Sequence, residues 1–123
     1  MTLLDAPMGT RLIDEFGLKP EDVLFANHAH PDAVRSLHAR DVAAGAEILL
    51  TNTFALPFRA AELNDGEIDA LFDAAIAHAL SAAPKAVHIS LGPAMLTSEA
   101  DRQRVLTCAV AAAKRTRASG LWF

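Results

Sequence analysis

Three polar residues, Thr51, Asn52 and Thr53, directly follow the apolar run Ile48-Leu49-Leu50 in this chain of 123 residues. A segment that is apolar on both faces is typical of a strand inside a parallel sheet, covered by helices on each side. Ligands of parallel α/β proteins collect at the carboxyl ends of such strands. The hydroxyl and amide groups could therefore hold a polar ligand, or they could simply end the strand and turn the chain. Taken alone, these residues favour neither interpretation.

Metal chemistry is the second possibility that the residue types raise. His28 and His30 lie two positions apart, a spacing that would suit a metal on an extended chain. A zinc site takes three or four ligands, and no third ligand is apparent nearby, so we do not expect a site there. Cys108 falls in the middle of an expected helix, where we expect a small buried apolar residue rather than a ligand.

The other three histidines are expected to be structural. His38 lies on the apolar face of an expected helix and should pack there. His78 lies off the apolar stripe of its helix and should be solvated. His88 lies in an expected strand, where it could point toward a barrel interior, but we expect a core histidine.

Helical and strand patterns alternate along the chain that carries these residues. Residues 3–4 predict a short strand, and residues 11–16 a helical turn, whereas residues 21–29 are poorly defined. Residues 31–44 predict a helix that starts with a proline, carries an apolar stripe and ends before Gly45. Residues 47–54 predict the next strand.

The second half of the chain repeats this alternation. Asn64 and Glu67 have capping-box spacing before an apolar stripe that predicts a helix to residue 80. Alternating residues predict a strand at 85–91. Ser98 is the expected N-cap of a last helix, and residues 121–123 begin another apolar run. Such alternation predicts an α/β protein with a parallel sheet and right-handed crossovers.

Chain length, net charge and composition limit the classes of function that this protein can have. A chain of 123 residues is one domain at most, and a net charge of −4 gives no basic surface for nucleic acid. The N-terminus does not resemble a signal peptide, and no apolar run has the roughly 20 residues of a membrane span. A single cysteine is compatible with a reducing compartment. We therefore expect a soluble, cytoplasmic protein with no nucleic-acid or membrane partner.

The loops after the three strands resemble one family. Leu3-Leu4-Asp5-Ala6-Pro7-Met8-Gly9-Thr10 is similar to the opening Leu-Leu-Asp-Gly-Ala-x-Gly-Thr of the homocysteine S-methyltransferase domain. Thr51-Asn52-Thr53-Phe54, with the helical segment before it, resembles the second unit of that domain. Ser90-Leu91-Gly92-Pro93 resembles the end of its third strand. The resemblance covers essentially the whole chain in the correct order.

The resemblance implies a (β/α)8 barrel, of which residues 1–123 would be the N-terminal part, since a complete barrel takes about 250 residues. It implies methyl transfer from a donor to the thiolate of homocysteine, giving methionine, with zinc held by three cysteines that this chain lacks. It also implies that Asp5, the backbone amide of Ala6, and Thr51 contact the amino acid end of homocysteine. Ala6 stands where the family usually has glycine.

Three hypotheses follow. The first is the N-terminal half of a homocysteine S-methyltransferase, inactive by itself. The second is a non-catalytic half-barrel for binding or assembly, which would self-associate or pair with a second-half chain. The third is an unrelated flavodoxin-like domain, although no glycine-rich phosphate loop supports a nucleotide-binding version.

Overall fold

A computed structural model of the protein describes residues 8–93, 97–116, 118 and 120–122. No helix in these ranges is long and apolar enough to cross a membrane. The elements are α1 (Met8–Phe16), the 3₁₀ helix η1 (Pro20–Asp22), α2 (Ala26–Ala29), α3 (Pro31–Ala43), β1 (Ile48–Leu50), α4 (Leu56–Arg59), the 3₁₀ helix η2 (Ala60–Glu62), α5 (Asp65–Leu80), β2 (Ala86–Ser90), α6 (Glu99–Arg115) and β3 (Gly120–Trp122).

Within the described part of the chain, the strands form one parallel sheet in the order β1-β2-β3. Leu49 pairs with Val87, and Ile89 pairs with Leu121. Helix α5 lies between β1 and β2 in the sequence, and α6 lies between β2 and β3. The expected α/β class with a parallel sheet is therefore confirmed. The strand expected at residues 3–4 lies outside the described residues.

The two faces of the sheet differ in burial, which corrects the expectation that helices cover both. Leu49, Val87 and Ile89 are fully buried on the face that packs against the helices. The opposite face is only half-buried, and it carries Ile48, Leu50, Ala86 and His88. His88 is accordingly a residue of the half-covered face rather than a core histidine. The described residues therefore bury this face of the sheet less than the face under the helices.

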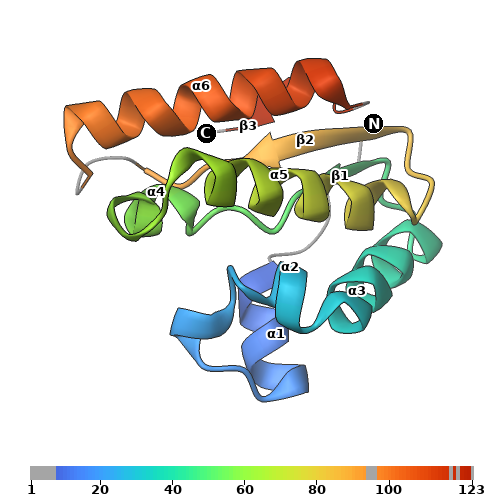
Figure 1. Ribbon diagram of the computed structural model, residues 1–123. Coiled ribbons are helices and arrows are strands. Elements are labelled where there is room, and N and C mark those ends of the chain that lie inside the picture. The colour runs from blue at the N-terminus through green and yellow to red at the C-terminus, as the bar shows by residue number, and fades with distance from the viewer. Residues whose placement is uncertain (1–7, 94–96, 117, 119, 123) are drawn as a thin grey trace.

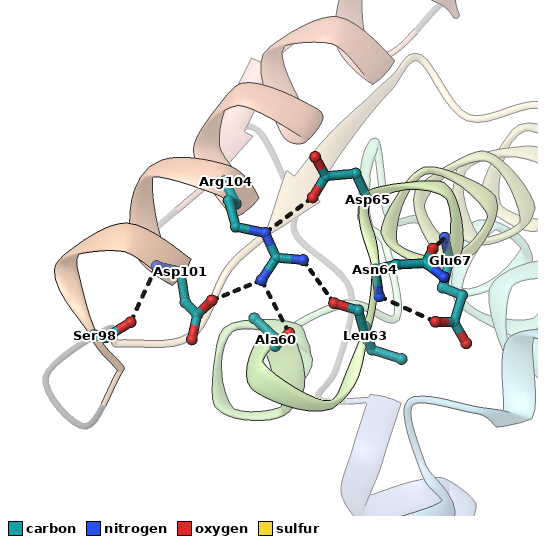
Figure 2. Close-up of polar contacts among 8 residues, drawn as sticks. All are labelled: Ala60, Leu63, Asn64, Asp65, Glu67, Ser98, Asp101 and Arg104. Carbon is teal, nitrogen blue, oxygen red and sulfur yellow. Dashed lines mark hydrogen bonds and ion pairs between the residues drawn. The ribbon is translucent and has the colours of Figure 1, made fainter.

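Helix α5 forms where the capping box and the apolar stripe predict it. The Asn64 side chain accepts a hydrogen bond from the Glu67 backbone N–H at 2.8 Å, and the Glu67 carboxylate accepts one from the Asn64 N–H at 3.0 Å (Figure 2). This reciprocal pair satisfies two backbone donors that the first turn of a helix leaves open. The predicted stripe is half-buried at its last residue, Leu80, and buried at the others: Ile68, Leu71, Phe72, Ala75, Ile76 and Ala79.

Helix α6 starts at the predicted cap, since the Ser98 hydroxyl accepts from the Asp101 N–H at 3.1 Å. Arg104 on this helix binds Asp101 at 2.6 Å and reaches Asp65, at the start of α5, at 2.9 Å (Figure 2). The same guanidinium donates to the Leu63 carbonyl at 2.6 Å. Arg104 thus joins α6 to the chain that leads into α5.

Helices α1, α2 and α3 gather on the side of the molecule away from α6 (Figure 1). They enclose a second apolar cluster of Met8, Leu12, Val23, Ala26, Val34 and Leu37. Arg11 and Asp41 join α1 to α3 through two parallel contacts of 2.7 and 2.6 Å. Residues 21–29, which have no clear pattern in the sequence, form part of η1, a turn and the short helix α2.

Candidate functional site

The carboxyl end of β1 carries the three polar residues singled out in the sequence. Thr51, Asn52 and Thr53 are all buried. The Thr53 N–H donates to the Thr51 carbonyl at 2.9 Å, which closes a tight turn over three residues. The side chains of Thr51 and Thr53 therefore face β2, and the side chain of Asn52 faces the other way.

The two threonine hydroxyls bond to the end of β2. The last regular ladder bond runs from the Thr51 N–H to the His88 carbonyl at 3.0 Å. Beyond it, the Ser90 N–H donates to Thr51 Oγ1 at 3.1 Å, and Thr53 Oγ1 donates to the Ser90 carbonyl at 2.6 Å. The two hydroxyl oxygens lie 2.7 Å apart. We call this closed set of Ser90 N–H, Thr51 Oγ1, Thr53 Oγ1 and Ser90 carbonyl the hydroxyl ring.

The hydroxyl ring has a clear structural cause. Where β1 turns away, the Thr51 carbonyl and the Thr53 N–H bond to each other and no longer pair with β2. Buried backbone groups need partners, so the N–H and carbonyl of Ser90 would otherwise lose theirs on this side. The threonine side chains supply them and hold the ends of β1 and β2 together.

Asn52 anchors the same turn to the helices on its other side. Its Nδ2 donates to the Val23 carbonyl at 2.8 Å, and the backbone carbonyl of Asn52 accepts from Asn27 Nδ2 at 2.7 Å. Asn27 is buried on α2 and also donates to the Leu24 carbonyl at 2.8 Å. The turn after β1 is thus fixed from both sides.

His78 continues this network, and its position corrects the expectation that it is solvated. It is buried, and its Nε2 contacts the Asn27 carbonyl at 2.8 Å. Arg35 Nε donates to His78 Nδ1 at 3.0 Å, so Nδ1 is an acceptor and the ring N–H is on Nε2. The side of α5 that lies off the apolar stripe is covered by α2 and α3, which the sequence pattern of α5 does not reveal.

His38 is packed in the interior, as expected from its place on the apolar face of α3. It is fully buried, and neither ring nitrogen has a hydrogen-bond partner among the described residues. Burial, with a smaller contribution from the positive charge of Arg11, lowers the pKa of His38 from 6.5 to about 4. The imidazole is therefore neutral at pH 7.

A pair of exposed phenylalanines borders the turn. The rings of Phe54 and Phe58 lie 6.3 Å apart, with 56% and 41% of each residue exposed. The Gly92 N–H donates to the Phe54 carbonyl at 2.9 Å, which brings the end of β2 against the loop after β1. A Cβ atom at position 92 would lie only 2.5 Å from that carbonyl and 2.8 Å from Phe58 Cε2. Glycine is required here by close contact.

Zinc, which the family resemblance implies, does not fit the residues that the structure describes. His28 lies on the short helix α2 and His30 follows it, so they are not on an extended segment, and both are exposed. No group of three or more His, Cys, Asp or Glu residues in the described ranges could hold a metal ion. Cys108 is buried in α6, as expected, and burial raises the pKa of its thiol to about 11, with Asp69 adding to the effect. That thiol stays protonated at pH 7 and is a poor metal ligand.

Of the three residues expected to contact substrate, the structure places Thr51 at the carboxyl end of β1. Asp5 and Ala6 lie outside the described residues. The sequence patterns do not reveal Asn27, whose side chain holds the turn, or the role of the Ser90 backbone. A signal existed for Ser90, because it ends the strand that must lie beside β1.

Comparison with protein-family models gives one match, to the family described as homocysteine S-methyltransferase, over residues 2–119. The match extends over nearly all of the 123 residues and confirms the resemblance drawn from the three loops. Comparison with curated proteins gives no match.

Proposed function

Because the chain belongs to the homocysteine S-methyltransferase family, we propose that it takes part in the transfer of a methyl group to the sulfur of homocysteine, giving methionine. The observation that carries this proposal is the family match over residues 2–119. The carboxyl end of a parallel strand is also where ligands of α/β proteins bind.

The role that we propose for this chain is to hold the amino acid end of homocysteine. Thr51 would contact it directly, together with Asp5 and the backbone amide of Ala6. The fixed turn after β1 supports this role for Thr51, because both Thr53 and Asn52 restrain it from opposite sides. A restrained hydroxyl loses little conformational freedom on binding, which favours affinity.

We further propose that residues 1–123 are the N-terminal part of a (β/α)8 barrel domain. The parallel order β1-β2-β3 and a sheet with one face packed under helices support this architecture. In such a barrel, the half-buried face of Ile48, Leu50, Ala86 and His88 would line the interior.

The zinc of the family domain would be held by cysteines that this chain does not contain. The 123-residue chain alone should then neither bind zinc at nanomolar concentration nor transfer methyl groups. Tight zinc binding by the isolated chain would contradict this division of roles.

The half-buried sheet face favours a second candidate, a non-catalytic assembly module that pairs through this face. Size-exclusion chromatography with light scattering distinguishes it: the module should self-associate, whereas a stable monomer would argue strongly against it.

The test of the methyltransferase proposal is the native protein itself. Its intact mass should exceed 13.1 kDa, and Thr51→Val should weaken methionine formation by raising the KM for homocysteine. Methyl transfer with an unchanged KM in that variant would remove Thr51 from the site.

A further inference from the structure

We infer that Thr53 is a positioning residue that makes the Thr51 hydroxyl a hydrogen-bond acceptor toward the substrate, so that Thr51 takes the ammonium group of homocysteine and not its carboxylate. This inference rests on the proposed function, and it adds the chemical group that Thr51 recognises and the residue that sets this preference.

The direction of the hydrogen bonds in the hydroxyl ring follows from a count of its protons. Each threonine hydroxyl has one proton to donate and two lone pairs to accept with. Thr53 Oγ1 lies 2.6 Å from the Ser90 carbonyl, which can only accept, so the Thr53 proton is used there. The contact of 2.7 Å between the two hydroxyls must then be made by the Thr51 proton. The Ser90 N–H donates to Thr51 Oγ1 and occupies one of its lone pairs.

The opposite direction of the ring is less favourable. If Thr53 donated to Thr51 instead, the Ser90 carbonyl would lose its hydroxyl donor. Ser90 is buried at the end of β2, so this carbonyl would be left without that partner in the interior. Thr53 is itself fully buried, so water does not compensate. Loss of a partner by a buried polar group is strongly unfavourable, which keeps the ring in one direction.

The consequence for binding follows directly. With its proton committed to Thr53 and one lone pair committed to Ser90, the Thr51 oxygen has one lone pair left. That lone pair can accept a hydrogen bond from an ammonium group. A carboxylate offers only acceptors and gains nothing from it. A hydrogen bond to a charged donor is also the stronger kind.

The first experiment uses analogues of the substrate. The native protein and its Thr51→Val variant are titrated by calorimetry with homocysteine, its desamino analogue and its decarboxylated analogue. Thr51→Val should weaken binding of homocysteine and of the decarboxylated analogue by about tenfold or more, the value of one charged hydrogen bond. It should leave the desamino analogue unaffected. The reverse pattern, in which the loss persists without the amino group and vanishes without the carboxylate, would overturn the inference.

The second experiment tests Thr53. Thr53→Val removes the acceptor of the Thr51 proton, so the Thr51 hydroxyl can rotate and donate, and the preference for the ammonium group should fall by about tenfold. Thr53→Ser keeps the hydroxyl and should restore wild-type selectivity, which a purely structural role for the side chain would not require. Hydrogen exchange at the Ser90 amide and circular dichroism show whether each variant keeps the fold. If Thr53→Val does not fold, the analogue series with Thr51→Val decides alone.

The outcomes separate this inference from the function it rests on. A native wild-type protein that binds no homocysteine would overturn both. Wild-type binding with unchanged selectivity in a folded Thr53→Val variant would overturn the role of Thr53 and leave the proposed function in place.

Discussion

Replacing His38 with leucine should remove an acid-sensitive part of the stability of this protein. The imidazole is fully buried, and neither of its nitrogens has a hydrogen-bond partner within the described part of the chain. A buried, unpartnered base resists protonation, and Arg11 adds unfavourable positive charge nearby. Leucine has a similar volume and cannot be protonated, so the variant isolates the titration of this one group.

The magnitude follows from the pKa of His38, which burial lowers from 6.5 to about 4. Between these values the unfolded chain binds a proton that the folded chain does not, so stability falls as the pH falls from 6.5 toward 4. The full difference corresponds to roughly 3 kcal/mol, reached below about pH 4. Between about pH 7 and about pH 4.5, His38 should account for about 2 kcal/mol of lost stability.

Urea unfolding at these two pH values measures the effect. Wild type should lose about 2 kcal/mol more than His38→Leu between them. His28→Gln, at an exposed histidine of the same region, serves as the control and should follow wild type. Parallel losses in wild type and His38→Leu would show that His38 does not titrate as a buried, unpartnered group, and would refute the reasoning.

Three further predictions concern capping and packing, and each is tested by urea unfolding. Asn64→Ala should lower the free energy of unfolding by about 1 kcal/mol through loss of the capping box, and Asn64→Asp should retain most of it; equal losses would argue against the cap. Gly92→Ala should cost about 1–3 kcal/mol because its Cβ would overlap the Phe54 carbonyl. Gly9→Ala, where a Cβ meets only an ordinary contact at 3.5 Å, should be neutral or slightly stabilising. Asn27→Leu should cost about 1–3 kcal/mol by leaving buried carbonyls without a donor, and an unchanged midpoint would contradict the anchoring role of Asn27.

The features that the sequence predicts correctly are local ones. The capping box at Asn64, the N-cap at Ser98 and the buried stripe of α5 each depend on residues three or four positions apart. Such patterns are visible without knowing what packs against them. The parallel sheet follows from the same alternation of strand and helix patterns.

The features that the sequence does not predict depend on packing between distant segments. Helix α2 has four residues, which is too short to show an apolar period, yet it covers the side of α5 that carries His78. The expectation that His78 is solvated was wrong for this reason. The polar run after β1 pointed to Thr51, but the direction of the hydroxyl ring requires the Ser90 backbone beside it.

The most direct test of the central claim, that Thr51 lies in a homocysteine site, is a titration of the nitrogen-labelled native protein with homocysteine, followed by NMR. The amide signals of Thr51, Thr53 and Ser90 should shift saturably, and the shifts should be lost in Thr51→Val. They should persist in Thr107→Val, the same substitution at an exposed threonine of α6. Saturable shifts that are equal in the two variants, or none at these residues in wild type, would contradict the account.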